Sequence, residues 1–183
     1  KDIRNIVTIE DLDRFVKDIL IPTVNDWKLD NKSNFLRLGL NSMQQYRIKF
    51  ILGKITAYVD ALRLGKTTVD DLTSYTQTAV EIEHIMPQTC ADKELYGMND
   101  EDFSVYINRL GNLTLLENSI NKSIHNDVYA NKSKAYKQSK FYLTSSLSEL
   151  VNQGHDTAIN RTNSLLFAWS DWNKRSIEER QEM

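Results

Sequence analysis

The chain has 183 residues, of which 40% are hydrophobic and 26% charged, and its formal net charge is −2. This composition suits a soluble globular domain with its own core, and no apolar run approaches the length of a membrane span. One cysteine, Cys90, excludes an internal disulfide framework and a CxxC zinc site, and it favours a cytoplasmic location. Since the chain starts at Lys1, without methionine or a signal peptide, we expect a piece of a longer polypeptide.

Residues 1–78 show apolar residues at helical spacing and no catalytic constellation. A capping-box pattern precedes a helix predicted over 9–20, which Pro22 should end. A second capping-box pattern begins at Ser42, and the long helix after it should end at Gly65. This part of the chain is therefore expected to be mostly helical.

Two segments within that part lack a long apolar pattern. Residues 25–41 are polar and turn-rich, so they predict a loop that Trp27, Phe35 and Leu38 anchor to the body. Residues 68–75 predict only a short helix. Neither segment offers a cluster of chemically reactive groups, so functional residues are expected further along the chain.

The pattern changes near residue 79. Residues 79–86 are apolar and β-branched and predict a strand that Pro87 ends. After a loop and a short helix capped by Asn99, residues 113–116 predict a second strand. From about Ser119 the chain turns helical again.

The remaining residues predict long helices, one over 129–150 and one from Thr157 or the residue before it through Ile177. The expected fold class is therefore α+β, with a strand–loop–strand–helix centre inside helices. We divide the domain into a helical N-terminal part (1–78), a core (79–140) and C-terminal helices packed on the core (141–183).

Polar side chains gather at the two predicted strands. Phosphodiester hydrolysis needs a base to activate water and a cation to stabilise developing charge, and histidine titrates near neutral pH. His84 offers that base, while Glu83 and Asn121 offer the oxygen ligands that Mg²⁺ prefers. Asn112 follows a glycine in a turn, where its amide would hold a backbone group or orient His84. These residues suit a one-metal phosphodiester hydrolase.

Neighbouring residues of a regular strand point to opposite faces. Glu83 and His84 can therefore serve one site only if the backbone bends after Glu83. Pro87 favours such a bend.

Three motifs occur in order: Glu83-His84-Ile85-Met86-Pro87-Gln88, then Leu110-Gly111-Asn112-Leu113-Thr114-Leu115-Leu116, then Asn121 with Asn126, Tyr129, Lys132, Tyr136 and Ser139. Together they resemble the HNH (ββα-metal) nuclease motif. More narrowly, the chain resembles the C-terminal nuclease domain of GmrSD-type, modification-dependent restriction enzymes. The resemblance is strong over about 80–140, and it implies a core of two short strands and a helix embedded in a mostly helical domain.

The resemblance also implies roles for individual residues. His84 would be the general base, Asn112 would position it, and Glu83 with Asn121 would bind one Mg²⁺ or Mn²⁺ ion. Many HNH nucleases carry Asp where this chain has Glu83. The metal contact is therefore expected to be longer, mediated by water, or made by Glu81 instead.

A run of lysines beside the site offers contacts to DNA phosphates. Lys122 and Lys132 are the candidates closest to the motifs, and Lys132 matches a position of the family. His125 lies four residues after Asn121, which would place it on the same helix face as a second metal ligand or a phosphate contact. Its alternative is a solvated helix residue. No motif for reading bases is present, so we expect cleavage with little sequence preference.

The resemblance implies a metal-dependent DNA endonuclease domain that nicks or cuts double-stranded phage DNA in a bacterial anti-phage, modification-dependent restriction system. A nucleotide-hydrolysing, modification-sensing domain in the same polypeptide or complex would be its partner, because this sequence carries no nucleotide-binding motif; no membrane partner is expected. A nickase or an RNA-directed nuclease is the enzymatic alternative. The alternative from another class is a catalytically degenerate HNH fold that only binds DNA or a partner protein.

Overall fold

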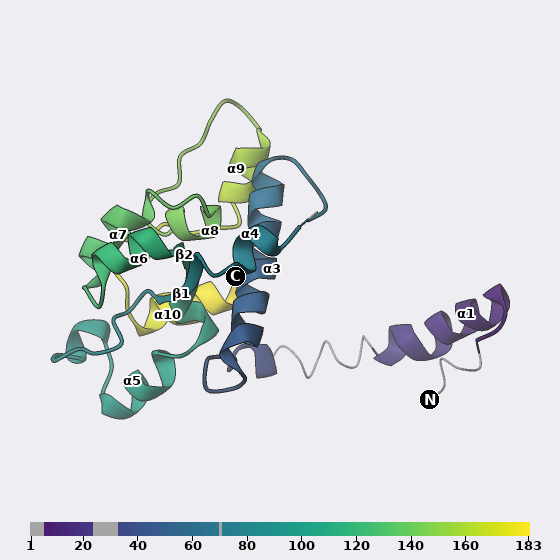
Figure 1. Cartoon of the computed structure of the whole chain (residues 1–183), viewed down its shortest axis with the longest axis horizontal. Helices are drawn as coiled ribbons and strands as arrows, with labels where there is room; N and C mark the ends of the chain where they lie inside the picture. The colour runs from purple at the N-terminus through teal and green to yellow at the C-terminus, as the bar shows by residue number, and fades with distance from the viewer. Residues whose placement is uncertain (1–5, 24–32, 70) are drawn as a thin grey trace. The chain divides into compact units, whose positions relative to one another are not determined.

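The computed structural model describes residues 6–23, 33–69 and 71–183, and the chain forms two compact units, 1–37 and 38–183 (Figure 1). The described residues form helices and one two-stranded antiparallel sheet, which confirms the α+β class. No helix among them is long and apolar enough to cross a membrane. Trp27, one of the expected loop anchors, lies outside the described residues.

The N-terminal unit contains helix α1, Ile9–Phe15. Thr8 and Asp11 form the predicted capping box, in which each side chain accepts a hydrogen bond from the other residue's backbone N–H at 3.1 Å. A π-helical turn, Val16–Leu20, follows, and helical residues extend past Pro22. The prediction that Pro22 ends the helix is wrong, because a widened turn before a proline relieves the clash of its ring with the preceding turn.

Helix α3, Gln45–Arg63, packs against the sheet and ends as predicted, with Gly65 in the left-handed region at φ 72°. The predicted cap at Ser42 is wrong. The residue before the helix is Gln44, which makes no side-chain capping bond, and the Ser42 hydroxyl accepts from the backbone N–H of Gly39 at 3.2 Å. The turn before α3 therefore uses the hydroxyl that the helix would have used.

One smaller element of this region also differs from prediction. The helix expected over 68–75 is the single turn α4, Thr73–Thr76, whose first N–H is bound by the carboxylate of Asp71 at 2.9 Å. Of the expected loop anchors, Leu38 packs against the core of its unit as predicted. Phe35 belongs to the N-terminal unit and is 40% exposed.

The sheet pairs β1, Val80–His84, with β2, Leu113–Glu117, so that the two strands run antiparallel with Ile82 opposite Leu115. Helix α6, Asn118–Ile124, follows β2 directly and packs on both strands. Both predicted strands and the predicted helix are thus confirmed, and together they form a ββα unit.

The connection between the strands contains the 3₁₀ turn η3 (Glu94–Tyr96), helix α5 (Asp100–Tyr106) and a second 3₁₀ turn, η4 (Leu110–Asn112). Asn99 caps α5 as predicted, since its side-chain oxygen accepts from the N–H of Asp102 at 2.8 Å. Three buried aromatic residues of this connection belong to the same core cluster as Ile85 and Met86, which follow β1: Tyr96, Phe103 and Tyr106.

The helix predicted over 129–150 is two helices, α7 (Tyr129–Tyr136) and α8 (Tyr142–Ser145). Between them, Glu117 of β2 accepts hydrogen bonds from the Ser139 hydroxyl and from the backbone N–H of the next residue, both at 2.8 Å. A long-range contact therefore interrupts a pattern that is helical over short distances.

The final predicted helix is likewise divided into α9, Ala158–Asn163, and α10, Lys174–Glu182. Thr157 caps α9 as expected, through a bond from the N–H of Asn160 to its hydroxyl at 3.2 Å. The segment between the two helices is held instead to α8 and its neighbours, because the N–H of Trp169 donates to the Leu147 carbonyl at 2.9 Å.

Helix α10 is fixed to the turn that precedes β2. The buried guanidinium of Arg180 donates to the carbonyl oxygens of Gly111 at 2.9 Å and Leu113 at 2.8 Å. A Cβ atom at Gly111 would lie 2.2 Å from the carbonyl oxygen of Ile177, so only glycine permits this approach. These contacts fix the position of Asn112, which lies between the two anchored residues.

Candidate active site

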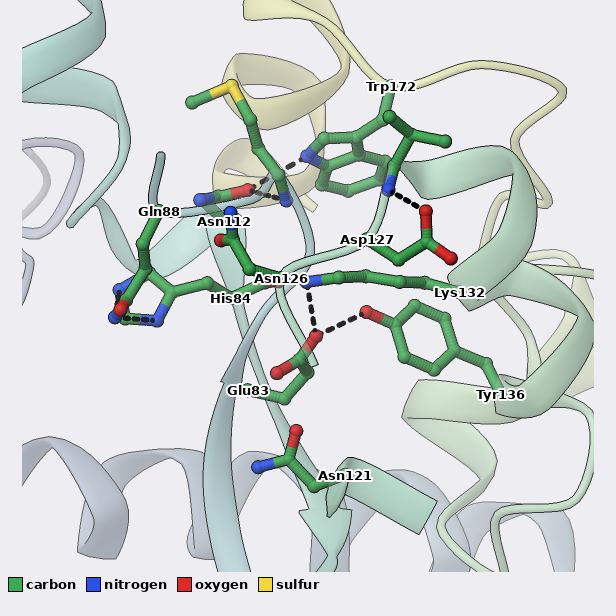
Figure 2. Close-up of polar contacts among 12 residues, drawn as sticks. Glu83, His84, Gln88, Asn112, Asn121, Asn126, Asp127, Lys132, Tyr136 and Trp172 are labelled. Carbon is green, nitrogen blue, oxygen red and sulfur yellow. Dashed lines mark hydrogen bonds and ion pairs between the residues drawn. The ribbon is translucent and has the colours of Figure 1, made fainter. Parts of the chain in front are cut away.

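One cavity of about 350 Å³ lies over β1 and the C-terminal part of α6, and it is lined by Glu81, Ile82, Glu83, His84, Gln88, Asn121, Lys122, His125, Asn126 and Lys132. The structure thus brings together six of the seven residues assigned to the site from the sequence. The seventh, Asn112, is fully buried behind the cavity. Figure 2 shows how most of these side chains lie around the end of β1.

His84 is the last residue of β1 and pairs with Leu113. The N–H of Ile85 still donates to the carbonyl of Asn112 at 2.9 Å, and the chain bends from there. The expectation of a bend directly after Glu83 is therefore wrong by one residue. Because the strand ends at His84, its ring and the Glu83 carboxylate reach the same cavity from adjacent positions.

His84 is 7% exposed. Burial lowers its pKa from 6.5 to about 4; the nearby Lys132 ammonium also lowers the pKa, whereas a hydrogen bond to the Asn108 side chain acts in the opposite direction. The Gln88 amide nitrogen lies 2.8 Å from Nδ1 and 3.4 Å from Nε2. Near neutral pH the ring is consequently uncharged, which is the form that accepts a proton.

Glu83 is bound inside the protein by two groups of α7. The Lys132 ammonium donates to its Oε1 at 2.7 Å and to the main-chain oxygen of His84 at 2.6 Å, and the Tyr136 hydroxyl donates to the same Oε1 at 3.0 Å (Figure 2). Burial raises the pKa of Glu83, although Lys132 and Tyr136 lower it in part. Burial against Glu83 also raises the pKa of the Tyr136 hydroxyl well above its ordinary value.

The expectation that Lys132 contacts DNA phosphates is corrected by this arrangement. Its side chain is 2% exposed, and its ammonium is engaged by Glu83 and by the backbone of His84. A buried ammonium paired with a buried carboxylate supports the strand end and leaves no charge for a ligand outside.

Glu81 lies two residues before Glu83 and so on the same face of β1. Its two carboxylate oxygens accept hydrogen bonds from the side-chain amides of Asn118 at 2.6 Å and Asn121 at 2.7 Å. The first turn of α6 is thus joined to the strand by side chains. Asn121 reaches the cavity as expected, but its contact in this structure is with Glu81.

Asn112 holds the chain that leaves β1. Its side-chain oxygen accepts from the backbone N–H of Met86 at 2.8 Å and from the indole N–H of Trp172 at 2.9 Å, while its amide donates to the carbonyl of Ile107 at 2.8 Å. Of the two roles expected for it, holding a backbone group is the one these contacts make. Its influence on His84 therefore passes through the backbone.

The cavity opens toward three exposed residues at and after the end of α6: Lys122, His125 and Asn126. His125 lies just beyond the helix with φ 44°, so the expectation that it shares a helix face with Asn121 is wrong. Asn126 donates through its amide to the backbone and hydroxyl oxygens of Thr89, at 2.8 and 2.6 Å, and so ties the loop after β1 to this opening.

The donor set fits a hard divalent cation. Two carboxylates, Glu81 and Glu83, and the amide of Asn121 line one cavity, and oxygen ligands of this kind bind Mg²⁺ with several waters retained. In the described part of the chain no three His, Cys, Asp or Glu side chains group closely enough to enclose a metal ion. An open site that keeps water on the ion suits these residues better than a closed protein cage.

Sequence reasoning did not assign roles to Gln88, Asn108 or Asn118, which contact the predicted site residues. Gln88 was visible as part of the first motif, four residues after His84 and directly after a proline. Asn118 lies three residues before Asn121, the helical spacing that places both on one face. Asn108 has no such local indication, because the contact depends on how the connection between the strands folds.

Comparison with known families identifies the chain over most of its length. Residues 25–183 match the C-terminal domain of GmrSD restriction endonucleases, a range that contains every residue of the cavity. Searches among curated proteins and among solved structures found no match. The matched region covers most of the chain, and the family is one of restriction endonucleases, which indicates a nuclease. The chain belongs to the family of GmrSD restriction endonuclease C-terminal domains.

Proposed function

We propose that this chain is a metal-dependent DNA endonuclease domain of the HNH type. The observation that carries the proposal is that one cavity is lined by an uncharged histidine, His84, by the oxygen donors Glu83 and Asn121, and by the exposed Lys122. The ββα unit of β1, β2 and α6 holds those residues at the strand end and the adjoining helix.

In the proposed reaction His84 takes a proton from the attacking water, since its ring is neutral at physiological pH. Asn112 holds the backbone that follows His84 and thereby fixes the ring. Asn121 together with Glu83, or with Glu81 in place of Glu83, would hold one Mg²⁺ or Mn²⁺ ion, which when bound supplies charge stabilisation at the phosphate and the leaving oxygen.

The Gln88 amide occupies the side of the ring where Nδ1 would meet water. Gln88 therefore has to share this nitrogen with the water or turn away as DNA enters. Lys122 and His125 at the opening would contact phosphates on either side of the cleaved bond. Nothing in this set of residues reads bases, so the cleavage is proposed to be weakly sequence-dependent.

The biological setting follows from the family rather than from the cavity. The proposed substrate is double-stranded phage DNA, within a bacterial modification-dependent restriction system. A nucleotide-hydrolysing domain that senses the modification would act with this chain, in the same polypeptide or complex. The proposed location is the cytoplasm.

One observation favours a second candidate function, a catalytically silent module that binds DNA or a partner protein. The Lys132 ammonium lies 2.7 Å from the Glu83 carboxylate and competes there with any cation. If the ammonium cannot be displaced or supplemented at this carboxylate, the fold would retain DNA binding without hydrolysis.

A cleavage assay separates these functions. Supercoiled plasmid is incubated with wild type, His84→Ala or the control His155→Ala, in Mg²⁺, Mn²⁺ or EDTA; His155 is exposed and outside the cavity. We expect wild type and His155→Ala to cut with metal only, and His84→Ala to cut about 10²- to 10⁴-fold more slowly.

Plasmid left intact with every metal, or cut equally by His84→Ala, would contradict the catalytic assignment. A gel shift without cutting would then support the binding module. Open-circular and linear products distinguish nicking from double-strand cleavage, and an RNA substrate tests the remaining enzymatic alternative.

A further inference from the structure

The carboxylate of Glu81 lies between two asparagine side chains of one helix. It accepts from the amide nitrogens of Asn118 and Asn121 at 2.6 and 2.7 Å, one on each oxygen. We propose that Glu81 is a positioning residue that turns the amide oxygen of Asn121 toward Glu83, where a divalent cation binds. This inference rests on the proposed function and assigns Glu81 a role distinct from direct metal ligation.

The backbone brings these three residues together. Asn118 and Asn121 are three residues apart in the first turns of α6 and therefore share a face. The N–H of Asn118 donates to the carbonyl of Ala79 at 2.9 Å, which fixes the start of the helix beside the start of β1. The two amides thus meet Glu81 without any rearrangement of either element.

Hydrogen-bond chemistry fixes which way the Asn121 amide faces. A carboxylate accepts hydrogen bonds and donates none, so the amide must present its nitrogen to Glu81. The amide oxygen is then directed away from Glu81. In Figure 2 this oxygen points toward the Glu83 carboxylate, which is the direction a shared cation requires.

The same contacts argue against Glu81 as a direct ligand. Both of its oxygens already accept short bonds from amide nitrogens, and a cation bound to Glu81 would have to displace one of them. By contrast, an oxygen of Asn121 oriented by Glu81 is ready to bind without displacement. Partners that orient a ligand in this way commonly contribute about 10- to 100-fold to metal affinity.

The test measures Mn²⁺ affinity by calorimetry in wild type, Glu81→Gln, Asn121→Asp and the double variant. We expect Glu81→Gln to weaken Mn²⁺ binding about 10- to 100-fold, because glutamine can bind the amide of Asn121 in either orientation. Asn121→Asp places a second carboxylate against Glu81, and their repulsion should also weaken binding.

The double variant gives the decisive comparison. With aspartate at position 121, the glutamine amide introduced at position 81 can donate to it, so Glu81→Gln should leave Mn²⁺ affinity unchanged or raise it in this background. If Glu81 is itself a ligand, the substitution will lower affinity in both backgrounds, and the inference is overturned. Glu94→Gln, an exposed carboxylate outside the cavity, is the control and should leave affinity unchanged.

A substitution at Asn118, the second hydrogen-bond donor to Glu81, tests the same inference if urea unfolding shows that Glu81→Gln does not fold. Asn118→Ala removes one of the two donors that hold the Glu81 carboxylate. A positioning Glu81 then holds Asn121 less firmly, and Mn²⁺ affinity falls severalfold. A direct ligand freed from a competing donor would bind Mn²⁺ more tightly, which would overturn the inference.

Failure of the proposed function gives a different result. Wild type that neither binds Mn²⁺ nor cuts DNA overturns the metal site and this role with it. Wild type that binds Mn²⁺ while Glu81→Gln binds it equally well overturns only the role of Glu81.

Discussion

The cavity has two sides that differ in burial. The buried wall consists of Glu83, His84 and Lys132, each less than a tenth exposed and each hydrogen-bonded within the protein. The exposed rim consists of Lys122, His125 and Asn126. Both sides carry charged or titratable groups, but only those of the wall have lost most of their water.

This difference determines what a substitution should change. In the wall a charge is stable only with its partner, so removing one member leaves an uncompensated buried charge. On the rim water solvates the Lys122 ammonium, so removing it changes stability by a few tenths of a kcal/mol at most. The wall should therefore respond in stability and the rim in DNA binding.

Lys132→Met should produce the largest stability change. It leaves the Glu83 carboxylate buried without its ammonium partner, and we expect a loss of about 3–5 kcal/mol in the free energy of unfolding, measured with urea. Lys122→Met on the rim is the matched control and should change stability by less than about 0.5 kcal/mol.

The same variant can be combined with Glu83→Gln. Neutralising both members removes the uncompensated charge, so the double variant should be more stable than Lys132→Met alone. Equal losses in the two lysine variants would show that the wall and the rim do not differ as their burial indicates.

The pH dependence of stability tests the wall at His84. The folded chain keeps this ring neutral down to about pH 4, whereas the unfolded chain protonates it near pH 6.5. Between these values the unfolded state binds more protons, so stability falls as pH falls, by roughly 3 kcal/mol in total from this residue.

The measurement is urea unfolding in EDTA at several pH values for wild type, His84→Gln and His155→Gln. The stability of wild type relative to His84→Gln should decline from pH 6.5 toward pH 4, while His155→Gln should follow wild type. A constant difference between wild type and His84→Gln would mean that the ring is hydrated in the folded protein.

Substitutions of Trp172 and Trp169, which lie behind the buried wall, should change stability less than Lys132→Met, and the two can be compared directly. The Trp172 indole N–H donates to Asn112, whereas the Trp169 indole nitrogen is buried without a hydrogen-bond partner among the described residues. Trp172→Phe should therefore cost about 1–2 kcal/mol of unfolding free energy, and Trp169→Phe should cost less or be neutral, because it removes an unsatisfied donor. Equal costs would mean that ring volume, rather than the bond to Asn112, decides the outcome.

The parts of the fold that sequence predicted are those with local causes. The strands, the cap at Asn99 and the stop at Gly65 depend on short apolar and β-branched runs, an N-cap side chain and a left-handed glycine, all readable within a few residues. The long helix expected over 129–150 failed because Glu117, more than twenty residues earlier, binds Ser139 and the residue after it. No local pattern contains that contact.

The residues of the candidate site also divide into those that local sequence motifs predicted and those whose positions depend on other contacts. The motifs identified residues that do line one cavity, including Glu83, His84 and Asn121. The sequence predicted, however, that Lys132 faces solvent and contacts DNA phosphates. Its partner Glu83 is 49 residues away, and a lysine on a polar helix normally faces water. His125 was misplaced for a more local reason, since α6 ends one residue before it.

Lys122→Ala tests the rim with the smallest expected effect on free energy. Within the described part of the chain no carboxylate pairs with Lys122, so its ammonium is available to a phosphate at the mouth of the cavity. Loss of one phosphate contact should weaken DNA binding severalfold and reduce the slope of log affinity against log salt by about 0.9. Fluorescence anisotropy with a DNA duplex in EDTA measures both the affinity and its salt dependence without cleavage.

Lys137→Ala is the control for Lys122→Ala, because Lys137 already pairs with Glu149 at 2.9 Å and lies outside the cavity. A salt slope that falls for Lys137→Ala but not for Lys122→Ala would place the DNA on α7 and away from this rim.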